Sequence, residues 1–233
     1  MACTERRFFG VPLVEQSPDE LAASWGGERS RLGALIFADR MLLWRLARSR
    51  VTRQFLLDID GRIAPVGRGT ARQVRVATGC RVGPFVEFQS VVRIMARAEE
   101  DTSSVYLVGR SAEQLQRVEQ NVRATFPALR VVGRAVFHPA NTASITTAIR
   151  KAGPRLVFVG SDAPVLLRWI RDQAGDFGPV LTIVSGRAAQ RMAGRPQAPR
   201  SGAWLALLIR PFVWPALLVH RLMARRRRNT RTA

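Results

Sequence analysis

The chain has 233 residues, 47% of them hydrophobic, so it can bury one substantial core and is not expected to be disordered. Lys and Arg number 37 against 17 Asp and Glu, which gives a formal net charge of +20. Lys151 is the single lysine, so almost all of the basic residues are arginines. The two cysteines, Cys3 and Cys80, exclude a disulfide framework and a cysteine-based metal site, and favour a reducing compartment.

The amino-terminal segment predicts a helix and then a strand. Ser17 and Glu20 form a capping box with proline at the first helical position, so a short helix is expected to run to about Trp25. A strand is expected at residues 34–38 (ALIFA) and a helix at 41–48. The start of the chain holds no apolar run long enough for a secretory signal, which predicts a cytosolic protein.

A second strand is expected at residues 55–59 (FLLDI), ending at the turn Asp60-Gly61. Residues 62–75 are polar and contain glycine, and are expected to form a loop with a short helix. A helix is expected at about 86–98. Three apolar residues are expected on one face of that helix: Val86, Val91 and Ile94.

From residue 104 to residue 186 one pattern recurs: an apolar run, a glycine at or near its end, and a helix. The expected strands are residues 104–109, 129–133, 155–160 and 179–186. The expected helices begin at the capping box of Ser111 and Gln114, near Asn141, and at Pro164. Near-continuous Val, Leu and Ile indicate strands buried on both faces. We therefore predict that residues 1–199 form a Rossmann-like α/β domain with a mostly parallel sheet, helices on both faces, and a ligand site at the carboxyl ends of the strands.

Residues 200–233 read as a separate appendage, apolar and rich in arginine. The stretch 203–223 is apolar, but Arg210 near its centre would cost about 2.5–3.5 kcal/mol inside a bilayer, and two prolines interrupt it. We expect one or two short helices in the membrane interface, with tryptophans at headgroup depth and four consecutive arginines on anionic lipid. A spanning helix, and a helix packed on the domain with a solvated basic tail, stay open as alternatives.

Other chemistries have little support in the sequence. The two histidines stand apart, and His138 before Pro139 is typical of a hydrogen-bonded turn. The chain has no GxGxxG motif, no P-loop and no nucleophile elbow with a Ser-His-Asp pattern. The dense basic run follows an apolar segment that contains tryptophan, which favours lipid over nucleic acid. No metal site, cofactor or nucleic-acid partner is expected.

The order of these motifs resembles the WecG/TagA/CpsF family of bacterial glycosyltransferases (family 26) over nearly the whole chain. The most specific match is residues 104–133 (SVYLVGRSAEQLQRVEQNVRATFPALRVVG). The other matching stretches are residues 9–13 (FGVPL), the helix that begins at Ser17, Asp60-Gly61, and residues 156–170, 183–199 and 203–215.

The resemblance implies an inverting, UDP-sugar-dependent hexosyltransferase of surface polysaccharide or exopolysaccharide biosynthesis. It would move a hexose or N-acetylhexosamine, typically N-acetylmannosamine, to a polyprenyl-diphosphate-linked acceptor while attached peripherally to the cytoplasmic face of the cell membrane. Other polysaccharide-assembly enzymes are candidate partners, and residues 200–233 would contact the anionic membrane surface.

The resemblance also implies roles for individual residues. Asp60 would be the general base, with a turn-capping aspartate before glycine as the alternative. The acceptor would contact Asp39, Arg75 and Gly79. The donor would contact Gly61, Gly109, Gly160, Ser161, Gly186, Arg195, Arg200, Arg210 and Arg221. For the last two arginines, contact with the diphosphate and contact with lipid both stay open.

Several family residues are replaced in this chain. Asp39 stands where the family has the asparagine of Thr-Pro-Asn, and it either hydrogen-bonds the acceptor or caps the next helix. Residues 164–167 read Pro-Val-Leu-Leu where the family has Pro-Lys-Gln-Glu, so leucines replace its polar Gln-Glu pair. Arg195 and Arg200 are close enough to replace a missing family arginine. A second function is therefore open: a catalytically weakened relative that serves as a membrane-associated sugar-nucleotide-binding or scaffold protein.

Overall fold

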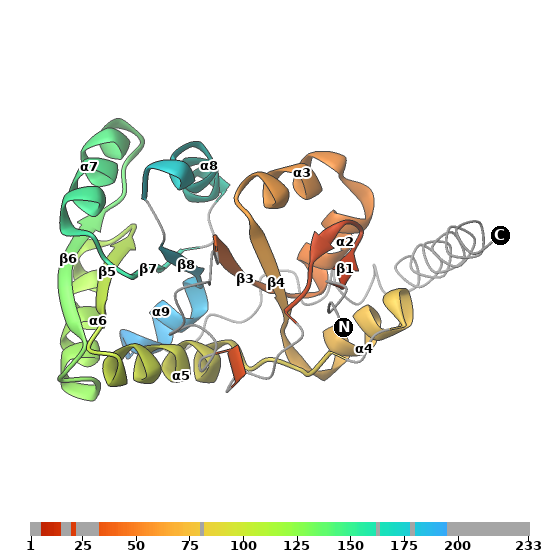
Figure 1. Ribbon diagram of the computed structural model, residues 1–233, viewed down its shortest axis with the longest axis horizontal. Helices are drawn as coiled ribbons and strands as arrows, with labels where there is room; N and C mark the ends of the chain where they lie inside the picture. The colour runs from red at the N-terminus through yellow and green to blue at the C-terminus, as the bar shows by residue number, and fades with distance from the viewer. Residues whose placement is uncertain are drawn as a thin grey trace.

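The computed structural model describes residues 6–14, 20–21, 33–79, 82–161, 164–177 and 180–194. Its centre is a six-stranded sheet with the order β4-β3-β8-β7-β5-β6 (Figure 1). The strands are β3 (Ala34–Ala38), β4 (Gly61–Pro65), β5 (Ser104–Gly109), β6 (Arg130–Val136), β7 (Leu156–Val159) and β8 (Leu181–Val184). Every neighbouring pair is parallel, so the carboxyl ends of all six strands lie along one edge of the sheet.

A short antiparallel pair, β1 (Arg7–Phe8) and β2 (Val11–Pro12), lies beside the edge strand β4. Leu13 forms a parallel bridge with Ile63, and the Val14 N–H donates to the Ile63 carbonyl at 3.0 Å. These bonds satisfy part of the open edge of β4, which would otherwise expose unpaired backbone groups.

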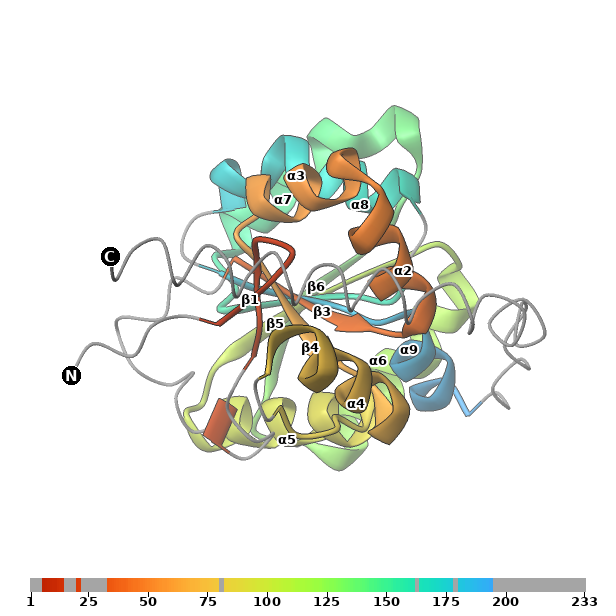
Figure 2. The ribbon, with the colours of Figure 1, turned by 90° about the vertical axis from the view of Figure 1, so that its right-hand side faces the viewer.

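Helices cover both faces of the sheet (Figure 2). One layer contains α2 (Arg40–Arg48), α3 (Arg50–Asp58), α7 (Thr142–Ala152) and α8 (Pro164–Gln173). The opposite layer contains α4 (Gly67–Thr78), α5 (Glu87–Glu100), α6 (Ala112–Thr125) and α9 (Gly186–Met192). Two short 3-10 helices, η1 (Pro139–Asn141) and η2 (Ala174–Phe177), precede α7 and follow α8. The predicted parallel sheet with helices on both faces is confirmed.

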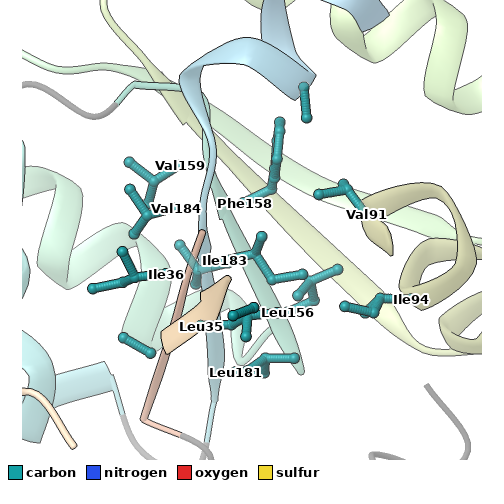
Figure 3. Packing of buried hydrophobic residues seen from close by; sticks show 14 of the residues in the cluster. Leu35, Ile36, Val91, Ile94, Leu156, Phe158, Val159, Leu181, Ile183 and Val184 are labelled. Atoms are coloured by element: carbon teal, nitrogen blue, oxygen red, sulfur yellow. The ribbon is translucent and has the colours of Figure 1, made fainter. Parts of the chain in front are cut away.

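The core lies between the sheet and these helical layers. Every residue of β5, β7 and β8 is buried, because both faces of these strands are covered. Figure 3 shows Phe158 pointing toward Val91 of α5, while Val159 and Val184 point to the other face. A fully buried apolar side chain contributes about 1.5–3 kcal/mol relative to an exposed one, so this double coverage supplies much of the stability of the fold.

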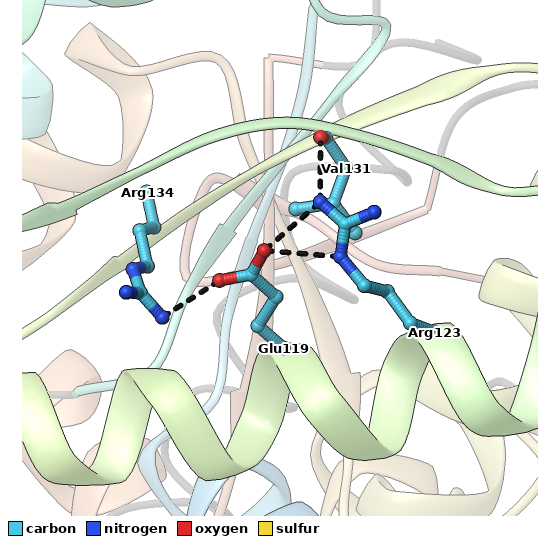
Figure 4. A network of polar contacts seen from close by, with 4 residues as sticks. All are labelled: Glu119, Arg123, Val131 and Arg134. Carbon is cyan, nitrogen blue, oxygen red and sulfur yellow. Dashed lines mark hydrogen bonds and ion pairs between the residues drawn. The ribbon is translucent and has the colours of Figure 1, made fainter.

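A polar network ties α6 to the edge strand β6 (Figure 4). The Glu119 carboxylate accepts hydrogen bonds from Arg134 of β6 at 2.7 Å and from Nε of Arg123 at 3.0 Å. Arg123 also donates to the Val131 carbonyl at 3.5 Å. Both arginines are about half exposed, with relative side-chain exposures of 57% and 46%, so each ion pair contributes at most about 1 kcal/mol.

The predicted strand at residues 55–59 is wrong. These residues form the last turns of α3 and the turn after it, with Leu56 and Ile59 buried and Leu57 exposed. The Ser49 hydroxyl caps α3 by accepting the Thr52 N–H at 3.1 Å, so the helix begins well before the apolar run. The strand lies instead at Gly61–Pro65, and α4 follows it, inside the segment that was predicted as a loop with a short helix.

Two smaller boundaries also differ from the sequence predictions. Val86 is the exposed residue before α5, whereas Val91 and Ile94 face the core as expected. Strand β6 continues through Gly133 to Val136. A Cβ at position 133 would lie 2.5 Å from the Tyr106 ring, so this glycine serves close packing inside the strand and does not end it.

Candidate functional site

The carboxyl edge of the sheet gathers residues that are far apart in the sequence. Because the strands are parallel, the residues that follow them share this edge: Asp39 after β3, Val66 and Gly67 after β4, Gly109 and Arg110 at the end of β5, Gly160 and Ser161 after β7, and Ser185 to Arg187 after β8. The chain leaves β3 into α2 on one face and leaves β8 into α9 on the other (Figure 2). Adjacent strands with connections to opposite faces form a topological switch point, the usual ligand site of open α/β sheets, and we call this point between the ends of β3 and β8 the crevice.

Asp39 lies at this crevice and caps α2. Its Oδ1 accepts the Leu42 N–H at 2.9 Å, which confirms the capping alternative raised from the sequence. Its Oδ2 lies 3.9 Å from Nη2 of Arg187, the second residue of α9. The side chains of Asp39 and Arg187 are 40% and 32% exposed, so both are accessible from solvent. A carboxylate and a guanidinium group from opposite helical layers therefore face each other at the point where the connections diverge.

Ser185 and Glu87 form a second link across this edge. The buried Ser185 hydroxyl donates to Glu87 Oε1 at 2.6 Å and accepts the Ala188 N–H at 3.0 Å. Ser185 therefore caps α9 and fixes the start of α5 against the end of β8. Neither residue is among the predicted site residues, and no sequence signal connects them, because 98 positions separate them along the chain.

The Arg40 guanidinium lies at the amino terminus of α4, the end at which the helix dipole is already positive. No side chain caps this helix and no acidic residue lies in its first turn. A Cβ on Gly69 would clash with the Arg40 guanidinium, so that guanidinium lies directly over the first turn of α4. Arginine next to a helix amino terminus is electrostatically unfavourable on its own, whereas both groups attract an anion such as phosphate.

Two of the predicted donor glycines have a packing role in the structure. A Cβ on Gly109 would lie 3.0 Å from the Leu115 side chain, and a Cβ on Gly160 would lie 2.8 Å from the Ala189 Cβ. Gly109 ends β5 as predicted, and Gly186 is the first residue of α9. These glycines let α6 and α9 approach the strand ends closely, which brings the helix amino termini to the candidate site.

Asp60 and Gly61 lie at the opposite edge of the sheet. Gly61 is the first residue of β4, and a five-residue strand, about 16 Å long, separates it from the carboxyl edge. The expectation that Asp60 shares an edge with Gly109, Gly160 and Gly186 is therefore wrong. Asp60 is exposed and has φ +47°, a left-handed conformation that Asp tolerates better than most residues, as in a turn.

The residues that do connect the end of β4 to a helix are Val66 and Gly67, and this pair has no carboxylate. Gly67 has φ +78°, which suits glycine at a sharp strand-to-helix turn. Sequence reasoning missed this junction because the strand before it was assigned to residues 55–59. A Gly-x-Gly spacing at residues 67–69 was the signal that could have located it.

Arg75 lies in the last turns of α4 and Gly79 caps its far end, about 12 Å and about 18 Å along the helix axis from Gly67. Gly79 has φ +76° and its N–H donates to the Arg75 carbonyl at 2.8 Å, so it ends the helix with a left-handed cap. His138 accepts the Ala140 N–H at 3.3 Å through Nδ1, which confirms the predicted turn.

Of the remaining predicted site residues, one lies within the described part of the chain. Ser161 follows Gly160 at the carboxyl edge. The predicted helix at Ser17 and the predicted site residues Arg195, Arg200, Arg210 and Arg221 lie outside the described residues, apart from Glu20 and Leu21.

Two features are absent from the part of the chain that the structure describes. Within it, no three His, Cys, Asp or Glu side chains come together as a group that could hold a metal ion. None of its helices has the length and apolar character needed to cross a membrane.

Comparison with known proteins adds one match. The sequence model described as the glycosyl transferase WecG/TagA/CpsF family matches residues 6–225, nearly the whole chain. None of the curated proteins matches the sequence.

Proposed function

Because the chain belongs to the WecG/TagA/CpsF family of glycosyltransferases, we propose that it transfers a hexose or N-acetylhexosamine from a nucleoside-diphosphate sugar at the carboxyl edge of its sheet. The acceptor is a polyprenyl-diphosphate-linked sugar, and the product enters surface polysaccharide or exopolysaccharide biosynthesis. Because relatives of this family are expected to use UDP-sugars and to invert the anomeric carbon, a UDP-sugar donor and an inverted product should be tested first.

The observation that carries this proposal is the convergence of arginines and helix amino termini at one crevice. Arg187 lies in the first turn of α9 and Arg40 lies over the first turn of α4. Neither helix has an acidic residue in its first turn. A diphosphate would be held by the two guanidinium groups and by the amino terminus of α4, which no side chain caps, because guanidinium and backbone N–H groups both bind phosphate oxygens.

The chemistry of sugar transfer fits such a site. The acceptor hydroxyl oxygen forms a bond to the anomeric carbon, and the bond from that carbon to the phosphate oxygen breaks. The electron pair of the broken bond leaves with the nucleoside diphosphate, whose growing charge the arginines and helix amino termini stabilise. The hydroxyl proton must pass to a base on the protein or in water.

A second function is favoured by a specific observation. The junction at Val66-Gly67 carries no carboxylate, and Leu166, which stands in place of a polar family residue, has 0% exposure. A buried leucine can neither hydrogen-bond a nucleotide nor reach one. A weakened relative that binds a sugar nucleotide, or a partner enzyme, without turnover is therefore the alternative.

We also propose that residues 200–233 act as an appendage that attaches the enzyme peripherally to the cytoplasmic face of the membrane. The support is their composition: an apolar stretch with tryptophans, followed by arginines and free of acidic residues. Attachment there would bring the crevice to an acceptor that is itself anchored in lipid. Arg195, Arg200, Arg210 and Arg221 would add positive charge to the donor site or to the lipid contact.

The test is transfer of labelled sugar from a panel of UDP-sugars to a short-chain polyprenyl-diphosphate-sugar. We expect turnover by the full chain, and a loss of about ten- to hundredfold in kcat/KM for Arg187→Gln and for Arg40→Gln, the scale of one charge-assisted hydrogen bond. Arg117→Gln is the matched control, because Arg117 lies on α6 and is paired with Glu113 at 3.0 Å.

Each outcome of this assay has a separate meaning. Donor binding by calorimetry without transfer to any acceptor would favour the scaffold alternative. Neither binding nor transfer would exclude both functions at this edge. Equal losses in Arg117→Gln and in the two site variants would show that general surface charge, and not the crevice, controls the rate.

A further inference from the structure

We propose that Asp39 is the catalytic base of the transfer reaction. This inference rests on the proposed function and names the proton acceptor that the function requires. Three features of the molecule support it: the position of Asp39 at the crevice, the different surroundings of its two carboxylate oxygens, and the engagement of other carboxylates near this edge.

The two oxygens of Asp39 are in different situations. Oδ1 accepts the Leu42 N–H at 2.9 Å, which holds the side chain in one orientation at the start of α2. Oδ2 has Arg187 as its nearest cation at 3.9 Å, too far for a hydrogen bond. The side chain is 40% exposed, so an incoming hydroxyl group can reach the carboxylate. One oxygen thus fixes the carboxylate, and the other is available to take a proton.

Other described carboxylates near this edge are already engaged. Glu87, in the first turn of α5, accepts the buried Ser185 hydroxyl at 2.6 Å. Glu113, in the first turn of α6, pairs with Arg117 at 3.0 Å on an exposed helix face. Asp60 lies at the opposite edge, the length of β4 away. Asp39 is therefore the described carboxylate best placed to meet a substrate in the crevice.

The neighbours of Asp39 match what a base in this reaction needs. Ala38 pairs with Pro65, so Asp39 stands beside the Val66-Gly67 junction. The next residue, Arg40, places its guanidinium over Gly69 at the amino terminus of α4, and Arg187 faces Asp39 across the crevice. The proton acceptor and the cations that would hold the leaving diphosphate therefore converge on one strand end.

In the proposed step, Oδ2 of Asp39 accepts the proton of the acceptor hydroxyl as its oxygen bonds to the anomeric carbon. The bond between that carbon and the donor phosphate oxygen breaks, and its electron pair leaves with the nucleoside diphosphate. Asp39 ends protonated and returns its proton to water after the products leave. No metal, oxidant or additional reactant is needed for this balance.

The decisive variant is Asp39→Asn. Asparagine caps helices as well as aspartate does, because its side-chain oxygen also accepts a backbone N–H, so α2 should stay intact. The amide cannot take a proton from the hydroxyl, and kcat should fall about 100- to 10,000-fold. The KM for the donor and the melting temperature should stay within experimental error. Partial recovery of Asp39→Gly activity by added formate would identify the missing group as a carboxylate.

Two further variants complete the experiment. Asp58→Asn is the control, because Asp58 lies at the exposed end of α3 and accepts a hydrogen bond from Gln54 at 2.8 Å. It should keep full activity. Asp60→Asn should also retain turnover. If Asp60→Asn loses turnover while Asp39→Asn keeps it in full, the proposal is overturned in favour of Asp60.

The assay separates this proposal from the function on which it rests. A full chain that is inactive with every donor and acceptor fails at the level of the proposed function. An active full chain with an Asp39→Asn variant of equal kcat leaves the function standing and excludes Asp39 as the base.

Discussion

Tyr106 links the packing of a single residue to the pH dependence of folding. It is the one tyrosine of the chain, 5% exposed on β5, with its ring against Gly133 of β6. Burial raises the pKa of the Tyr106 phenol above its ordinary value of 10.0, because the charged tyrosinate is poorly solvated inside the sheet layer. Folding therefore favours the protonated phenol.

The sign of the pH effect follows from this direction. The stabilisation is fully present below pH 10.0 and is lost as the pH rises through the raised folded-state pKa, because the unfolded chain releases the proton first. We expect the unfolding free energy of the wild type, measured by urea unfolding, to fall above pH 10.0 relative to that of Tyr106→Phe. A single tyrosinate absorbance titration reports the same event, and an ordinary pKa there would contradict the prediction.

Only some of the individual residues of the candidate site could be predicted from the sequence. The sequence placed five residues at the carboxyl edge of the sheet, because each ends or follows an apolar run: Asp39, Gly109, Gly160, Ser161 and Gly186. The pairing of Ser185 with Glu87 could not be predicted, because a hydrogen bond between residues 98 positions apart depends on the complete fold. Arg40 and Arg187 could not be distinguished from the other arginines of so basic a chain.

The contact between the Arg40 guanidinium of α2 and Gly69 of α4 is the element-level feature on which the proposed donor site depends. Gly69 leaves room for the Arg40 guanidinium, and an alanine there would displace it. We expect Gly69→Ala to weaken donor binding severalfold in calorimetry while leaving stability unchanged or raising it by up to about 1 kcal/mol, because alanine favours helices over glycine.

Gly83→Ala is the matched control for this prediction, because a Cβ on Gly83 meets no heavy atom within 4 Å. It should bind donor like the wild type. Equal donor affinity in Gly69→Ala and Gly83→Ala would show that Arg40 does not contact the donor.

The secondary structure could be predicted best where burial is complete. The runs at β5, β7 and β8 are apolar without interruption, and their strands were predicted close to their observed bounds. The run FLLDI was ambiguous, because five apolar-rich residues fit a buried strand and the inner face of a helix equally well. In the structure these residues are helical, and the Ser49 hydroxyl caps the helix. Because the strand was predicted at residues 55–59, the true strand at Gly61–Pro65 and its junction with α4 were not predicted.

For the molecule as a whole, charge is concentrated at one end of the sequence. Residues from Arg200 onward contribute eight arginines and no acid. If residues 200–233 attach the chain to anionic lipid, replacing Arg225 to Arg228 with glutamine should weaken vesicle binding by about 1 kcal/mol per arginine.

The measurement is flotation with phosphatidylserine-containing vesicles and with zwitterionic vesicles. Binding by the full chain should need the anionic lipid and decline as salt is added, since salt screens surface charges. Binding that is equal in the wild type and in the glutamine variant would remove the basic run from the proposed attachment.

The order of the strands also determines when this protein can become complete during its synthesis. Strand β8 joins two partial sheets, β4-β3 and β7-β5-β6, and it is the last of the six to leave the ribosome. Until residues 181–184 emerge, β3 lacks one neighbour, and the nascent chain carries two unfinished halves with open apolar edges. Closure of the sheet is therefore a late event, and these open edges are sites where the nascent chain can aggregate until β8 has emerged.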